Sequence, residues 1–128
     1  MLDVLIFDLD ETMYPRQSGL MRAISERIGR YMVEQMGMDP VVVPKLRREY
    51  VERYGTTSRG LQLLHGLDVD GYMAYVHDLP LDEYIEANGE LDAMLSALPQ
   101  EKVIFTNASA GHARAVLEAL GVAHHFGL

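Results

Sequence analysis

The stretch that decides the fold lies near the N-terminus and reads Val4-Leu5-Ile6-Phe7-Asp8-Leu9-Asp10-Glu11-Thr12. Its first four residues form a continuous apolar run rich in branched side chains, which predicts a strand covered on both faces, as in the parallel sheets of α/β proteins. Tyr14-Pro15 follows, and the proline disfavours helix at the residue before it. The stretch therefore predicts a first strand that ends in an acidic loop.

Beyond this loop, apolar residues recur at steps of three and four, a spacing that is typical of amphipathic helices. We expect helices over residues 18–37, 57–65, 70–77 and 90–98. A further helix should begin between residues 40 and 44 and end at residue 54. A second apolar strand over residues 102–106 precedes a last helix, which Ser109 or Asn107 can cap and Gly121 can end. The order of strand, helical segment, strand and helix predicts an α/β fold.

The composition sets limits on function. The chain is 48% hydrophobic and 23% charged, which is the balance of an ordinary soluble domain, and it contains no cysteine for disulfides or thiolate metal sites. Its formal net charge of −8 argues against binding to nucleic-acid polymers. The apolar runs are too short to span a membrane, and the N-terminus lacks the features of a signal peptide. We therefore expect a cytoplasmic protein without a membrane partner.

Asp8 and Asp10 are the most informative residues. In open parallel sheets, ligands bind beyond the carboxyl ends of the strands, which is where this pair is expected. Aspartate is unfavourable in strands, and its charge is costly near the edge of a core, so the pair needs partners such as Mg²⁺, backbone amides or another cation. A lone aspartate would be typical of a turn cap. A pair of aspartates followed by Thr12 at the same two-residue step favours a ligand-binding site instead.

The string from Phe7 to Pro15 resembles the first motif of the haloacid dehalogenase-like (HAD) phosphohydrolases. The resemblance implies that Asp8 is a nucleophile that attacks phosphorus to form an aspartyl-phosphate, and that Asp10 is the acid and base. It also implies Mg²⁺ as cofactor, held by the Asp8 carboxylate and the Asp10 backbone carbonyl. Dehalogenating members lack an aspartate at the second position, so its presence favours phosphoryl transfer.

Thr106-Asn107 ends the second expected strand just ahead of a helix. At such a place a hydroxyl and the free N–H groups of the first helical turn can hold phosphate oxygens. The segment resembles the second HAD motif, an apolar strand that ends in serine or threonine. The resemblance implies that Thr106 and Asn107 bind phosphate.

Further segments resemble the pyrimidine 5′-nucleotidase branch of these hydrolases. They are Tyr14-Pro15, Tyr54-Gly55-Thr56-Thr57, Gly60-Leu61, Tyr75-Val76-His77-Asp78 and Phe105-Thr106-Asn107-Ala108. The resemblance implies a HAD-like Rossmannoid core formed by residues 1–15 and 89–128, with a helical cap inserted over residues 16–88. It implies a small phosphorylated metabolite, such as a nucleotide monophosphate, as substrate. Thr57, Arg59 and His77 could face that substrate, although each also suits an ordinary surface or core-edge position.

The sequence departs from the HAD pattern after the second motif. The family has a lysine and a further acidic group downstream, and residues 107–128 contain neither lysine nor aspartate. We therefore expect an incomplete core in which Val4 to Phe7 forms an exposed apolar edge, which favours homodimer formation. His124 and His125 are adjacent, and neighbouring side chains of a regular element diverge, so we expect no shared metal ion there.

Two alternatives to an active phosphohydrolase remain open. One is a catalytically incompetent HAD fragment, or an interaction module without enzymatic activity. The other is a phosphoacceptor receiver domain, which the long helical segment between the two expected strands disfavours.

Overall fold

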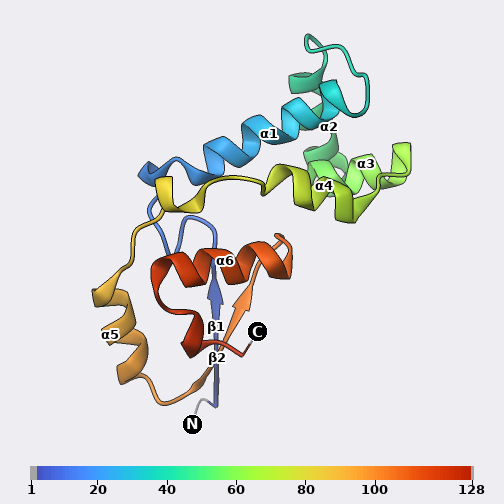
Figure 1. Ribbon diagram of the computed structural model, residues 1–128. Coiled ribbons are helices and arrows are strands. Elements are labelled where there is room, and N and C mark those ends of the chain that lie inside the picture. The colour runs from blue at the N-terminus through green and yellow to red at the C-terminus, as the bar shows by residue number, and fades with distance from the viewer. Residues whose placement is uncertain (1–2, 128) are drawn as a thin grey trace. The chain divides into compact units, whose positions relative to one another are not determined.

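Figure 1 shows a computed structural model of the chain, which describes residues 3–127. The chain divides into two compact units: residues 3–21 with 80–127 form the first, and Arg22–Leu79 forms the second. The role of the helical segment 16–88 as a cap stays a prediction.

The first unit contains a two-stranded sheet and several helices. Its elements are β1 (Val4–Asp8), η1 (Arg16–Ser18), η2 (Leu81–Glu83), α5 (Gly89–Ala97), β2 (Glu101–Phe105), α6 (Ala110–Leu120) and η3 (Ala123–His125). The strands are parallel, and their register runs from Val4 opposite Glu101 to Asp8 opposite Phe105. A parallel pair needs a crossover connection, which the intervening helices supply. The α/β class and a partial Rossmann-like core are thus confirmed.

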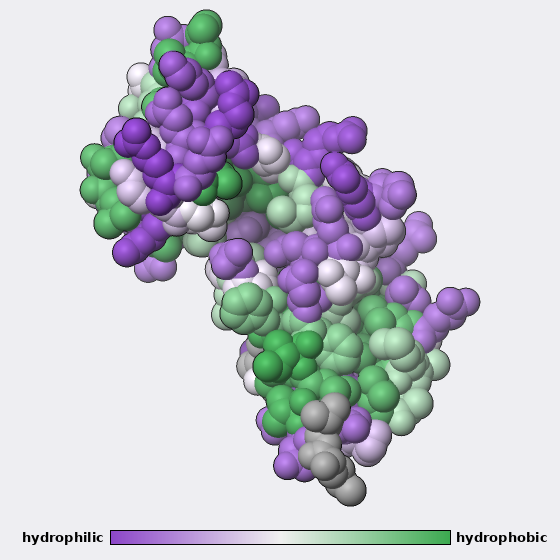
Figure 2. Space-filling view, turned by 180° about the vertical axis from the view of Figure 1, so that it is seen from behind, coloured by the Kyte–Doolittle hydropathy of each residue, from purple (hydrophilic) through white to green (hydrophobic). Residues whose placement is uncertain are grey.

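The two faces of this sheet differ in their cover. Helix α6 lies across one face (Figure 1), on whose side Leu5 and Phe7 are half-buried. On the other face Val4, Ile6 and Phe105 are 43%, 71% and 68% exposed. Figure 2 shows hydrophobic residues gathered on this side of the unit. The expectation that β1 is covered on both faces is therefore wrong for the described residues, because they place helices against one face only.

Both ends of α6 are defined by local hydrogen bonds. The Ser109 hydroxyl accepts a hydrogen bond from the His112 N–H at 3.2 Å, so Ser109 rather than Asn107 is the N-cap. At the other end Gly121 adopts a left-handed φ of +79°, as the sequence predicted. The Val122 N–H donates to the Leu117 carbonyl oxygen at 2.9 Å, which completes a Schellman motif. These local hydrogen bonds fix where α6 begins and ends.

The second unit is a small helical body. Its elements are the greater part of α1 (Leu20–Glu34), α2 (Val43–Tyr54), α3 (Thr57–His65) and α4 (Val69–Val76). The core that they share contains Met32, Tyr50, Leu61 and Tyr72, all nearly inaccessible to solvent. At Gly60 an added Cβ would lie 2.6 Å from the Tyr50 ring, so only glycine permits this close approach of α3 to α2.

The start of α2 lies within the range of residues 40–44 that the sequence predicted. Asp39 caps a separate turn, in which its Oδ1 accepts a hydrogen bond from the Val41 N–H at 2.9 Å. The helix itself begins at Val43, with Pro44 in its first turn. Proline is tolerated there because the first helical N–H groups have no intrahelical partner. Among residues 3–127, no helix has the length and the apolar character that crossing a membrane requires.

Candidate active site at the strand ends

The loop after β1 is a tight turn. Leu9 is fully buried, and its carbonyl oxygen accepts hydrogen bonds from the N–H groups of Thr12 at 3.3 Å and Met13 at 3.1 Å. Glu11 adopts a left-handed φ of +56°, which is uncommon for a residue other than glycine and costs about 1–3 kcal/mol. The sequence contained no signal for this conformation. The turn places Asp8 and Asp10 on either side of the buried Leu9.

Asp8 is the last residue of β1, and its side chain is exposed. The Thr12 hydroxyl donates a hydrogen bond to its Oδ2 at 3.0 Å. This contact orients the carboxylate while leaving it open to solvent. An oriented, accessible carboxylate has the properties that a nucleophile toward a small substrate requires.

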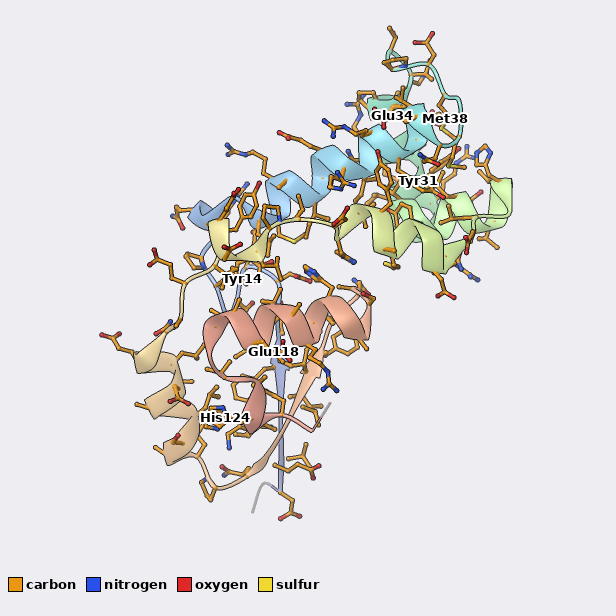
Figure 3. All side chains as sticks on the ribbon, in the orientation of Figure 1. Tyr14, Tyr31, Glu34, Met38, Glu118 and His124 are labelled. Atoms are coloured by element: carbon orange, nitrogen blue, oxygen red, sulfur yellow. The ribbon has the colours of Figure 1, made fainter. Side chains whose placement is uncertain are left out.

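Asp10 is half-buried and held through both carboxylate oxygens. The Tyr14 hydroxyl donates to Oδ1 at 3.1 Å, and the Thr106 hydroxyl donates to Oδ2 at 3.0 Å. Burial and the negative charge of Asp10 raise the pKa of the Tyr14 phenol well above its usual value, so Tyr14 stays a neutral donor. Figure 3 shows Tyr14 in the loop region beyond the end of β1. The two aspartates therefore differ sharply in their freedom to move.

Thr106 and Asn107 follow β2, as expected from the sequence. The Thr106 hydroxyl donates to Asp10 and accepts a hydrogen bond from the Ala108 N–H at 3.1 Å, so it links the two strand ends. Asn107 is exposed in the bend that precedes α6. The parallel register explains this meeting, because Asp8 pairs with Phe105 and the following residues leave the sheet at the same edge. Phosphate binding by these two residues stays a prediction.

His112 is a residue of this site that the sequence analysis did not single out. It lies in the first turn of α6 and is 5% exposed. Burial lowers the pKa of His112, and the negative charge of nearby Asp10 opposes this shift. Its position three residues after the capping Ser109 could have indicated that it lies near the strand ends.

Thr57, Arg59 and His77 all belong to the second unit. Thr57 is the first residue of α3, Arg59 is exposed two residues later, and His77 is half-buried at the end of α4. Thr57 also lines a cleft of about 450 Å³ together with Arg47 and Arg48. Contact of these residues with a substrate stays a prediction.

A cleft of about 870 Å³ opens beside the acidic loop in the first unit. It is lined in part by Met13 and Tyr14, whereas Asp8 and Thr106 are not among its lining residues. Four carboxylate side chains contribute to its wall: Asp82, Glu83, Glu86 and Glu90. Such a concentration of negative charge disfavours a phosphate ligand, so the large cleft and the strand-end site are chemically distinct.

The donor atoms at the loop fit a hard divalent cation. The exposed Asp8 carboxylate and the Asp10 backbone carbonyl offer oxygen ligands, which Mg²⁺ prefers over nitrogen or sulfur. The Asp10 carboxylate, in contrast, is already engaged by Tyr14 and Thr106.

Comparison with curated proteins finds a distant relative. No protein-family model matches the chain. The chain is 26% identical over 132 aligned residues to Phosphate metabolism protein 8 of Saccharomyces cerevisiae, and the alignment covers 96% of this chain. It covers 41% of the yeast protein, so the chain spans less than half the length of that relative. The chain is thus a distant and partial homologue of a phosphate metabolism protein.

Proposed function

We propose that this chain carries the nucleophile and the acid/base of a Mg²⁺-dependent phosphohydrolase for small phosphate esters, with nucleotide monophosphates as the substrate class. One observation supports this most directly: Asp8 is exposed at the end of β1, while Asp10 is held through both oxygens two residues later. The similarity to a protein named for phosphate metabolism supports the same class of chemistry.

In the first step, an Asp8 carboxylate oxygen attacks phosphorus, and the bond from phosphorus to the ester oxygen breaks. Protonated Asp10 donates its proton to the leaving oxygen, which departs as an alcohol. In the second step, the Asp10 carboxylate takes a proton from water, and the resulting hydroxide attacks the aspartyl-phosphate. Inorganic phosphate leaves, Asp8 returns to a carboxylate and Asp10 is again protonated.

The contacts of Asp10 suit these two roles. Thr106 now donates to Oδ2 at 3.0 Å, but a hydroxyl can rotate and accept a hydrogen bond instead. The Thr106 contact can therefore reverse when Asp10 carries the proton. Tyr14 keeps donating to Oδ1, because a phenol is neutral near pH 7 and burial raises its pKa further. Tyr14 thus fixes the orientation of Asp10 in both steps.

Mg²⁺ would be held by the Asp8 carboxylate and the Asp10 carbonyl oxygen, with the phosphate group supplying further ligands. When bound, the ion neutralises the negative charge that otherwise repels the substrate from Asp8. We expect weak Mg²⁺ affinity from this chain, because a single carboxylate provides limited charge compensation.

The proposal is tested by ¹⁹F NMR of the 128-residue chain with Mg²⁺ and beryllium fluoride, which forms a tetrahedral mimic of a phosphoryl group on a reactive carboxylate. We expect a bound fluoride signal in the wild type that is absent in Asp8→Asn. Asp3→Asn is the matched control, because Asp3 is also exposed and directly precedes the same strand. A nucleotide monophosphate should compete with the adduct. An unchanged signal in Asp8→Asn, or no signal in the wild type, would overturn the proposal.

A second candidate function is an interaction module that pairs with a second copy of the chain. The exposed apolar face formed by Val4, Ile6 and Phe105 favours this candidate. Such a face on a small unit is typical of a surface that another polypeptide covers. The two candidates are separable, because pairing does not require the Asp8 carboxylate.

A further inference from the structure

A second group of metal-ligating side chains lies in the first unit, away from the residues of the strand-end site. Asp92 of α5 and the adjacent His124 and His125 of η3 each offer one ligand atom, and these atoms lie within 4.8 Å of one another. The Asp92 Oδ1 atom is 3.2 Å from His124 Nε2 and 2.6 Å from His125 Nε2. The expectation that the two histidines diverge is therefore wrong.

The two histidines lie at the end of η3 with their rings close together. The two imidazole rings lie with their centroids 4.1 Å apart and their planes 39° from parallel, so both rings reach the same carboxylate. In Figure 3 the labelled His124 lies between α5 and the C-terminal segment. Adjacent side chains of a 3₁₀ turn start about 120° apart, so the shared Asp92 carboxylate, rather than the turn itself, marks where the two ring nitrogens meet.

The backbone that carries the two histidines is anchored on both sides. Before η3, the Val122 N–H donates to the Leu117 carbonyl oxygen at 2.9 Å. After it, Phe126 packs edge-on against Phe7, with ring centroids 5.9 Å apart, and bridges to Lys102 of β2. The histidines are therefore held in place by the sheet and by α6 before any ligand binds.

Helix α5 is anchored as well. Asn88 caps it by accepting a hydrogen bond from the Leu91 N–H at 3.0 Å, and its own N–H donates to the Leu120 carbonyl oxygen of α6, also at 3.0 Å. Leu95, which lies one helical turn beyond Asp92, is fully buried. All three candidate ligands thus come from segments that are tied to the same body.

We infer that Asp92, His124 and His125 form a binding site for a transition-metal ion with Zn²⁺-like preferences. Two imidazole nitrogens and one carboxylate oxygen are a typical donor set for Zn²⁺, with water completing a tetrahedral arrangement. The His124 side chain is 64% exposed and that of Asp92 is 43% exposed, so an ion can enter from solvent. The net charge of −8 further favours the approach of a cation.

The hydrogen bond between Asp92 and His125 must open when the ion enters. Ligand atoms around a tetrahedral Zn²⁺ ion are about 3.3 Å apart for bonds of roughly 2.0 Å, and the 2.6 Å contact is shorter than this. The His124 contact at 3.2 Å already matches that spacing. A small side-chain rotation of the partly exposed Asp92 is enough to widen the remaining contact.

The inference is tested with Zn²⁺ by titration calorimetry at about pH 7.5, on the full chain without a polyhistidine tag. We expect one Zn²⁺ ion per chain and at least a tenfold loss of affinity in His124→Ala, His125→Ala and Asp92→Asn. The absorption bands of bound Co²⁺ in the visible range report the coordination independently. Tetrahedral bands should appear in the wild type and be absent in these three variants.

Two controls keep the result interpretable. Asp8→Asn should bind Zn²⁺ as the wild type does, which separates this site from the strand-end site. His124→Ala is the decisive variant, because its side chain is mostly exposed and its removal should leave the circular dichroism spectrum unchanged. Zn²⁺ affinity that is equal in His124→Ala and the wild type, or no stoichiometric binding at all, would overturn the inference.

Discussion

The hydrogen bond between Tyr14 and Asp10 should contribute measurably to stability. Tyr14 is 3% exposed, and its hydroxyl lies 3.1 Å from Asp10 Oδ1. A hydrogen bond to a charged group contributes about 1.5–3 kcal/mol. Because Asp10 is only half-buried, we expect the lower end of this range, about 1.5 kcal/mol.

A double-mutant cycle with Tyr14→Phe and Asp10→Ala measures this coupling directly. Tyr14→Phe keeps the ring that packs in the core, and the cycle cancels the loss of the Thr106 contact in Asp10→Ala. The free energy of unfolding of the four proteins is measured by urea denaturation followed by circular dichroism. Tyr84→Phe serves as control, because the Tyr84 hydroxyl forms no hydrogen bond with residues 3–127, and it should change stability by less than about 0.5 kcal/mol. A coupling energy below about 0.5 kcal/mol would refute the reasoning.

Three further predictions concern pH dependence, turnover and assembly. Burial raises the pKa of Tyr72 to about 12 from 10.0, so the unfolded chain ionises first as pH rises. The free energy of unfolding, measured by urea titration, should therefore fall by about 2 kcal/mol between pH 10 and pH 12. Tyr72→Phe should reduce this fall. The same pH dependence of stability in Tyr72→Phe and the wild type would contradict the prediction. Hydrolysis of p-nitrophenyl phosphate by this chain should be near background, because the Lys102 ammonium is engaged by the carbonyl oxygens of residues 98 and 100 and cannot stabilise phosphoryl transfer at Asp8. Each missing electrostatic stabiliser of the transition state lowers the rate by about 10²–10³. A robust rate that Asp8→Asn abolishes would show that other groups supply the stabilising positive charge. Light scattering of the wild type should give twice the mass of one chain. The Ile6 side chain is 71% exposed, so Ile6→Lys should yield a folded monomer. A monomeric wild type would exclude pairing through the exposed apolar face of Val4, Ile6 and Phe105.

The sequence by itself was sufficient for features that depend on neighbouring residues. The apolar run predicted β1, Gly121 predicted the end of α6, and the sequence narrowed its N-cap to Ser109 or Asn107. Strand and helix periodicity and helix capping are local effects, because they involve residues a few positions apart. The position of Asp8 and Asp10 at a strand end was predictable for the same reason.

Tertiary structure alone decided which groups meet. Thr106 could be placed at the end of a strand from the sequence, but its partner Asp10 lies 96 residues away along the chain. The sheet register makes this contact, and it directs a hydroxyl that the sequence suggested for phosphate toward a carboxylate. Long-range pairing of this kind has no signature in local residue patterns.

The cover of the sheet and the convergence of the histidines have the same physical origin. A continuous apolar run shows that β1 suits burial on both faces, but only the placement of α6 decides which face is covered. His124 and His125 looked unsuited to a shared ligand because a regular element was assumed. Packing of the segment after α6 places both ring nitrogens beside Asp92, which lies on a separate helix. Contacts between distant segments depend on packing of the whole unit, which the order of residues specifies only through the folded structure.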